Sequence, residues 1–205
     1  MPRELQRYGD RAWLLQCEDD REARRVAEHL RQRESYGVED VVPGAASVLV
    51  SFTDLAAAEA SRHEILALAG DLAAPEPPLG HLVTIRVSYD GPDLESVASF
   101  LETSVDDVVA RHLAGAYHVA FMGFVPGFGY LRDSRQLLDV PRRPDPRTKV
   151  PAGAVAIAGG MSAVYPIASP GGWQLIGRTD AVMFDPGRAS PSLLTAGCRV
   201  RFVAA

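Results

Sequence analysis

Cysteine is scarce in this sequence of 205 residues: only Cys17 and Cys198 are present, and they lie far apart in the chain. Two cysteines cannot form a cysteine-based zinc site or a disulfide framework. We therefore expect no zinc site and assign no metal-ligating residue in this chain, and we interpret both cysteines as small buried side chains of a protein in a reducing compartment.

Long apolar runs are also missing. No run approaches the roughly 20 residues that a transmembrane helix needs, and residues 1–13 are too polar for a signal peptide. The formal net charge of −5 gives no sign of a nucleic-acid or anionic-membrane partner. We expect a cytoplasmic protein that binds neither membrane nor nucleic acid.

Histidine and glutamate are absent from the last third of the chain. Residues 1–140 hold 13 basic and 23 acidic side chains, whereas residues 141–205 hold 8 basic and 3 acidic ones. A positive segment without His or Glu is better suited to holding an anion than to supplying proton-transfer groups. The pattern predicts an anion-binding C-terminal part that depends on groups from elsewhere for acid–base chemistry.

The first part of the chain alternates between strand and helix patterns. Residues 12–17 are compact and apolar, and residues 20–33 place alanine, valine and leucine on one helical face. Residues 38–42 and 47–52 indicate a β-hairpin around Pro43-Gly44, and a further apolar helix follows Asp54. The order β, α, β, β, α predicts a ferredoxin-like α+β sandwich.

Three prolines within residues 74–80 favour an extended connector. We therefore expect two domains, residues 1–78 and 79–205. In the second, a strand over 81–88 precedes two helices, over 93–101 and from Ser104 to about 113. From residue 115 onward, 12 of the 18 glycines and 9 of the 15 prolines separate short apolar runs, which is typical of a β-barrel or sandwich.

An aromatic segment over residues 121–131 contains three glycines and a proline. It fits a tight barrel turn whose aromatic rings belong to the core. It equally fits a ligand wall, in which Gly127 and Gly129 admit a bound group that Phe128 or Tyr130 covers.

Four basic side chains follow within eight residues, interleaved with prolines: Arg142, Arg143, Arg147 and Lys149. Such a run is ordinarily a solvated surface, but the stiff segment also suits a carboxylate or phosphate. In the glycine-rich stretch 169–178, Trp173, Gln174 and Arg178 could share one pocket, although strand ends also need small residues.

His112 and His118 are the only histidines near the glycine-rich region. A lone histidine is ordinarily a structural residue, and a general acid/base role for His112 is the alternative. No nucleophile elbow, zinc-protease helix or phosphate-binding glycine loop is present in the sequence.

Several segments together point to one family: YDGPDL (89–94), GFVPGFGYL (123–131), PRR (141–143), VPAG (150–153), PGGWQLIGRT (170–179) and FDP (184–186). In this order they resemble the allophanate hydrolase subunit 1, or KipI-like, family, whose bacterial members include the B subunit of 5-oxoprolinase, PxpB. The resemblance covers about residues 81–203. The chain departs from the family pattern at Ala154, at residues 161–163 and at Cys198.

The resemblance implies a cyclophilin-like β-barrel after the N-terminal domain and a hydrolase active only in a hetero-oligomer. Its partners would be a paired cyclophilin-like subunit and a third subunit. The implied reaction is the opening of the small-molecule lactam 5-oxo-L-proline to L-glutamate with ATP and Mg²⁺, the nucleotide binding this chain or its partner. Some relatives are instead inhibitors that bind a histidine kinase, which is the alternative function.

For the implied reaction we expect His112 and Lys149 to be catalytic, with His112 as general acid/base. We expect Lys149, Arg147 and Arg178 to hold a carboxylate or phosphate. The pocket would be shaped by Phe128, Tyr130, Trp173 and Gln174.

Overall fold

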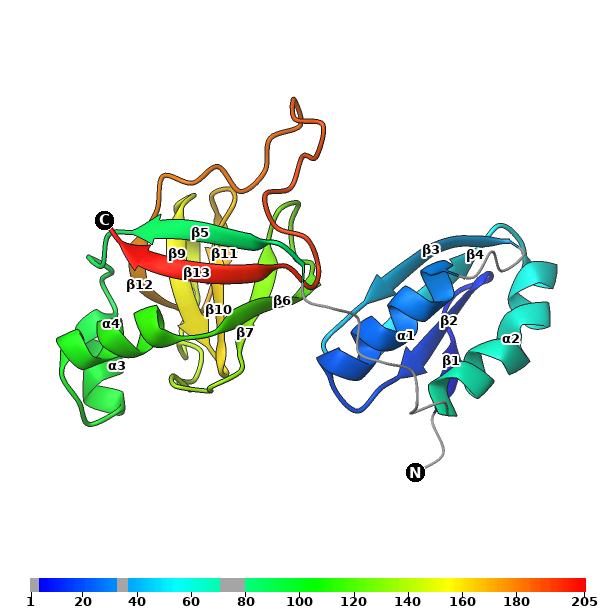
Figure 1. Cartoon of the computed structure of the whole chain (residues 1–205). Helices are drawn as coiled ribbons and strands as arrows, with labels where there is room; N and C mark the ends of the chain where they lie inside the picture. The colour runs from blue at the N-terminus through cyan, green and yellow to red at the C-terminus, as the bar shows by residue number, and fades with distance from the viewer. Residues whose placement is uncertain (1–3, 33–36, 71–79) are drawn as a thin grey trace. The chain divides into compact units, whose positions relative to one another are not determined.

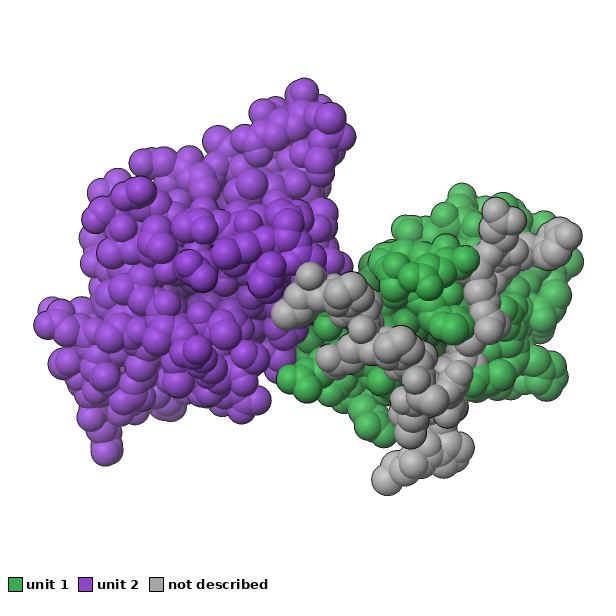
Figure 2. Space-filling view, viewed as in Figure 1, with its two compact units in different colours: residues 1–78 green, residues 79–205 purple. Residues whose placement is uncertain are grey.

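The computed structural model describes residues 4–32, 37–70 and 80–205. The chain divides into two compact units, residues 1–78 (unit 1) and 79–205 (unit 2), coloured separately in Figure 2. The proline-rich segment that carries the predicted domain boundary lies outside the described residues.

Unit 1 is a four-stranded antiparallel sheet with two helices. Its elements are β1 (Leu5–Arg7), β2 (Ala12–Gln16), α1 (Asp20–Gln32), β3 (Val38–Pro43), β4 (Ser47–Phe52) and α2 (Leu55–Gly70). Alternate strand residues, such as Trp13 and Leu15, are buried against apolar residues of both helices. This one-sided burial is what the period-2 and helical patterns predict.

The ferredoxin-like topology expected for this unit is not confirmed, and the observed strand order is β1-β2-β4-β3. The sequence pattern did not reveal β1, which pairs with β2 at one edge of the sheet and is only three residues long. Over the described residues of unit 1 the element order is therefore β, β, α, β, β, α, whereas the ferredoxin-like motif has a strand after its second helix. The mixed α+β class is confirmed, and the ferredoxin-like topology is not.

Unit 2 contains a seven-stranded sheet of order β12-β9-β10-β7-β6-β13-β5 (Figure 1). In chain order its elements are β5 (Leu82–Val87), α3 (Leu94–Phe100), α4 (Val105–Ala114), β6 (Tyr117–Met122), β7 (Gly129–Asp133), β8 (Arg147–Val150), β9 (Ala154–Ala158), β10 (Met161–Val164), β11 (Ser169–Gly171), β12 (Gln174–Arg178) and β13 (Arg199–Ala204). The two ends of this sheet meet where Ser88 and Arg178 exchange backbone hydrogen bonds of 2.9 Å. The sheet is therefore a nearly closed barrel, as the short runs between glycines and prolines predicted.

The helices α3 and α4 lie together beside one end of this barrel (Figure 1). The predicted N-cap of α4 is confirmed, because the Ser104 hydroxyl accepts a hydrogen bond of 3.1 Å from the Asp107 amide. None of the helices in the described part of the chain is both long and apolar enough to span a bilayer.

Unit 2 has two cores, and the strand β9 separates them. Val155 and Ile157 belong to the larger core, which also contains residues of α3, α4 and β13. The alternate residues Ala154, Ala156 and Ala158 belong to a smaller core on the other face of the sheet. Because these alanines are small, aromatic rings pack directly over the strand on that side.

Candidate functional site

The centre of the candidate site is Asp93, a carboxylate that is only 3% exposed at the start of α3. Arg147 donates two hydrogen bonds to it, from Nη1 to Oδ2 at 2.9 Å and from Nη2 to Oδ1 at 2.8 Å. Arg143 Nη1 donates to Oδ1 at 2.8 Å, and the Leu175 amide donates to Oδ2 at 2.7 Å. One carboxylate thus joins the arginine-rich segment to α3 and to β12.

These contacts determine the charge of Asp93. Burial alone would raise its pKa, but the hydrogen bonds from Arg147 and Leu175 and the positive charges of Arg147 and Arg143 outweigh burial, so the pKa is lowered. Asp93 is therefore ionised at neutral pH. A buried carboxylate with two arginine partners is an internal ion pair, which the Arg147 side chain would have to leave before it could bind a substrate anion.

Arg178 and Gln174, both on β12, also have partners within the chain. Arg178 Nε donates to Asp90 Oδ2 at 2.7 Å, and both side chains of this pair are exposed. Gln174 Nε2 donates to the Pro141 carbonyl at 3.1 Å. The structure thus brings Arg147, Gln174 and β12 to the same region, but as intramolecular contacts.

The aromatic residues form the smaller core of unit 2. The rings of Phe128 and Trp173 are nearly fully buried and meet edge to face, with centroids 6.0 Å apart. Half-buried Tyr130 packs against both rings and stacks on Phe121 with centroids 4.2 Å apart. This packing favours the core interpretation of Phe128 and Trp173 over the ligand-wall interpretation.

Phe124 is the exposed member of this cluster, and its residue type alone did not distinguish it from its aromatic neighbours. Its ring is 56% exposed and approaches the rings of Phe128 and Tyr165 with centroids 5.3 and 6.4 Å away. Its φ of 67° lies in the left-handed region that non-glycine residues rarely adopt. Strain of this kind and an exposed aromatic ring often accompany a binding surface.

His112 is completely buried in α4, and both of its ring nitrogens have partners. Nδ1 lies 2.7 Å from the Tyr89 hydroxyl, and Nε2 lies 2.9 Å from Ser162 Oγ. Ser162 donates its hydroxyl hydrogen to the Ala156 carbonyl at 3.2 Å. Ser162 must therefore accept from Nε2–H, and Nδ1 accepts from Tyr89.

Burial lowers the pKa of His112 to about 3, against the opposing influence of Asp133. The imidazole is neutral at pH 7 and packs on Phe202 and Tyr117, with ring centroids 4.4 and 5.3 Å away. With no exposed surface and no free nitrogen, His112 cannot meet a substrate in this conformation. The geometry favours the structural interpretation of His112 over the general acid/base one.

Two cations of the predicted basic segment remain available. Lys149, on β8, and Arg142 are both exposed, and among the described residues neither has an ion pair. Arg142 lies near Tyr165: burial and the nearby Tyr130 raise the pKa of Tyr165, and the charge of Arg142 partly opposes that increase. These two side chains are the anion-binding candidates of the site.

The donor set does not suit a metal ion. Within residues 4–32, 37–70 and 80–205, no three His, Cys, Asp or Glu side chains come together as a metal would require. The two carboxylates nearest the arginines, Asp90 and Asp93, are already ion-paired. The described residues therefore offer no complete set of protein ligands for a metal ion of their own.

The two-unit α+β architecture with a nearly closed barrel has known counterparts. The family described as carboxyltransferase domain, subdomain C and D, matches residues 3–194, and the chain belongs to this family. It is 48% identical over 129 residues to the B subunit of 5-oxoprolinase from Escherichia coli O157:H7, a match that covers 62% of this chain and 59% of that protein. It is 46% identical over 125 residues to the 5-oxoprolinase B subunit of Bacillus subtilis (strain 168), covering 60% of this chain and 52% of that protein.

The chain thus matches just over half the length of these curated relatives. A solved structure, that of TTHA0988, is similar over 95% of this chain with a TM-score of 0.80 and 38% identity. The similar region makes up 40% of the TTHA0988 chain. The same architecture therefore also occurs as part of a longer polypeptide.

Proposed function

We propose that this chain is the B subunit of an ATP-dependent 5-oxoprolinase, which opens the lactam of 5-oxo-L-proline to give L-glutamate. The observation that carries this proposal is the 44–48% identity to three proteins named as this component of 5-oxoprolinase. Identity at this level over about 60% of the chain supports a shared role.

We further propose that the enzyme is completed by a paired subunit of cyclophilin-like fold and by a third subunit. The chemistry of the described residues supports this division. Unit 2 offers exposed cations but no metal site among its described residues, and its buried histidine is already hydrogen-bonded on both sides. An ATP-dependent reaction needs Mg²⁺ ligands and acid–base groups, so other chains would supply them.

Within this division, Lys149 and Arg142 hold the carboxylate of 5-oxoproline or a phosphate group. Both are exposed on the segment that Asp93 anchors through Arg143 and Arg147. An anchored segment loses less side-chain and backbone freedom when it binds an anion than a flexible loop does. Asp93 and its two arginines would then be positioning residues.

The test is co-expression of this chain with the proteins encoded beside it, followed by an assay of ATP-dependent glutamate release from 5-oxoproline. We expect activity with the full set and none when this chain is omitted. Lys149→Ala should raise KM by about tenfold, the loss of one charge-assisted contact. The control Arg86→Ala, on the outer face of β5, should leave KM unchanged.

No glutamate release above the omission control would reject the assignment. Affinity capture of a histidine kinase, without a partner subunit, would instead support the kinase-inhibitor alternative. An unchanged KM in Lys149→Ala, with activity present, would reject only the anion-binding role of Lys149.

A further inference from the structure

The strand β13 is paired fully on one side and only partly on the other. The parallel strand β5 pairs with it from Arg199 to Ala204, whereas the antiparallel strand β6 pairs with it only at Arg199 and Val200. Beyond Val200, the side of β13 that faces β6 has no strand beside it within the described part of the chain.

The direction of the backbone groups follows from the ladder with β5. The Arg199 amide donates to the His81 carbonyl and the Ala205 amide to the Val87 carbonyl, each at 2.9 Å. In a parallel ladder, alternate residues of a strand hydrogen-bond to the same neighbouring strand. Because Arg199 and Ala205 bond to the β5 side, Phe202 and Ala204 direct their N–H and C=O groups to the opposite side. Among the described residues, no backbone partner is found for them on that side.

A groove of about 680 Å³ lies along this free edge. One wall is the loop from the end of α4 to β6, including Gly115 and Ala116, and the other is β13 from Arg199 to Ala204. The charged side chains in its lining are all basic: Arg135, Arg199 and Arg201. The described lining contains no carboxylate.

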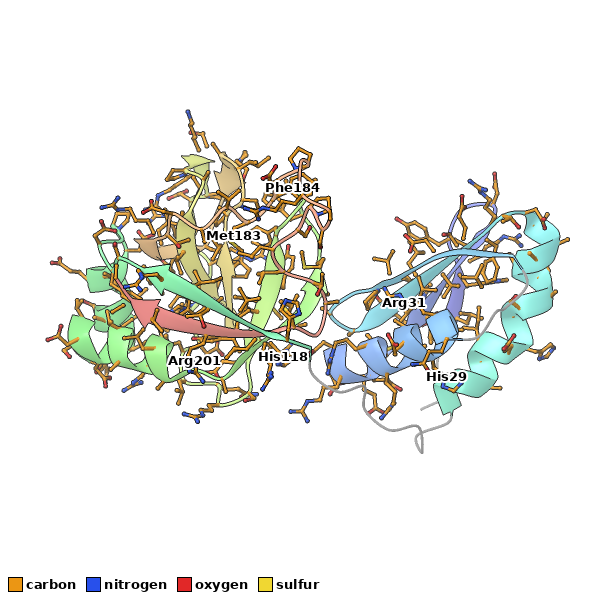
Figure 3. The ribbon with its side chains drawn as sticks, turned by 45° about the horizontal axis from the view of Figure 1, so that its top comes forward. His29, Arg31, His118, Met183, Phe184 and Arg201 are labelled. Atoms are coloured by element: carbon orange, nitrogen blue, oxygen red, sulfur yellow. The ribbon has the colours of Figure 1, made fainter. Side chains whose placement is uncertain are left out.

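Two of the three groove arginines, Arg135 and Arg199, donate hydrogen bonds to backbone carbonyls. Arg135 Nη1 donates to the Ala114 carbonyl at 2.9 Å, and Arg199 Nε donates to the Gly80 carbonyl at 3.2 Å. Arg201 is exposed and has no hydrogen bond or ion pair among the described residues. Figure 3 labels Arg201 and His118, which belong to β13 and β6.

The two faces of β13 differ in character. Val200 and Phe202 point into the larger core, where Phe202 meets His112, and Arg199 and Arg201 are exposed on the outer face. A strand added beside β13 would have the same alternation, because side chains of neighbouring strands at one level share a face. Acidic side chains would meet the arginines, and apolar ones would face the end of α4.

We propose that this groove binds an extended, acidic segment of another protein chain, which adds as a strand to the free edge of β13. Free backbone groups supply the hydrogen bonds of such an addition, and the arginines supply charge complementarity. The proposal concerns a surface distinct from Lys149 and Arg142 and does not depend on the reaction of the complex.

The test uses the full chain and a fluorescein-labelled hexapeptide of alternating glutamate and valine. Fluorescence anisotropy should show saturable binding that weakens with salt, and a peptide of alternating lysine and valine should not bind. Arg201→Glu should raise the dissociation constant of the glutamate peptide by at least about tenfold, and Arg201→Gln should raise it by less. The matched control Arg86→Glu, on β5 outside the groove, should change the dissociation constant less than about twofold.

Hydrogen exchange measured by NMR separates strand addition from loose electrostatic binding. The amides of Phe202 and Ala204 should exchange more slowly when the peptide is bound. N-methylation of alternate peptide amides should abolish binding. Equal binding of the lysine peptide, unprotected Phe202 and Ala204 amides, or displacement by inorganic phosphate at matched ionic strength would each overturn the proposal.

Discussion

At the residue scale, one buried carboxylate decides what the arginine-rich segment can do. Asp93 lies 50 and 54 residues before Arg143 and Arg147 in the chain, yet it accepts hydrogen bonds from both. Two cations that look free in the sequence are therefore committed to a structural ion pair. The cations left for a ligand are their sequence neighbours, Arg142 and Lys149.

The variant Asp93→Asn should destabilise unit 2 by about 3 kcal/mol, because it leaves two arginines and the Leu175 amide without their charged acceptor. The measurement is urea unfolding followed by circular dichroism. The matched control is Asp90→Asn, which removes the negative charge of the acceptor of the exposed Arg178 and should change stability little. Equal effects of the two variants would show that burial of Asp93 is not the cause.

His112 predicts a pH dependence of stability. Its folded pKa of about 3 lies below the ordinary value of 6.5, so the unfolded chain binds the proton more readily. The contribution of the neutral, buried His112 to the free energy of unfolding is fully present above about pH 6.5, and it is lost as the pH falls toward the folded pKa. The free energy of unfolding should therefore decline between about pH 6.5 and 4.

The check is the same unfolding series in His112→Gln, which cannot titrate. We expect a lower stability at pH 7 and a flatter profile below pH 6.5. All other ionisable side chains are the same in the two proteins, so the difference between the two profiles isolates His112. Parallel profiles would contradict a neutral buried imidazole.

At the scale of elements, β9 shows how one strand supports two cores. Its residues alternate between alanine and a branched apolar residue, and all five are buried. The alanines leave room for Phe128 and Trp173 on the outer side, and Val155 and Ile157 fill the barrel on the inner side. The aromatic segment of the sequence thus finds its place because a distant strand is small on one face.

Enlarging one of these alanines should disturb the aromatic layer. Ala156→Leu should cost about 1–3 kcal/mol in the free energy of unfolding, because the added atoms overpack a fully buried position. The near-ultraviolet circular dichroism spectrum of this variant should also change, since the rings of Phe128 and Trp173 lose their fixed environment. The control Ala110→Leu, at an exposed position of α4, should leave stability and the aromatic spectrum unchanged.

At the scale of the whole molecule, the two-part layout of the sequence corresponds to two compact units, each with cores of its own. Local patterns predicted most elements because apolar spacing and turn residues act over a few positions. The strand β1 escaped prediction because three residues are too short to show a period. The family resemblance, carried by ordered motifs, agrees with the match to residues 3–194.

The candidate site was less predictable than the fold. Residue types alone identified the basic segment and the aromatic cluster, but not which cations are already paired. The one feature of the sequence that could have singled out Phe124 is its place between Gly123 and Val125 in a tight turn. Its positive φ is visible only in the folded backbone. The free edge of β13 has no sequence signature, because it depends on where β6 begins to pair.

The sequence by itself thus determined the class of the protein, the positions of most helices and strands, the basic character of its last third and its family. Tertiary structure alone decided that Arg147 and Arg178 bind aspartates, that His112 is buried with both ring nitrogens hydrogen-bonded, and that Phe128 and Trp173 pack in the smaller core. The physical reason is that charge pairing, desolvation and close packing depend on groups far apart in the chain, which only the folded barrel brings into contact.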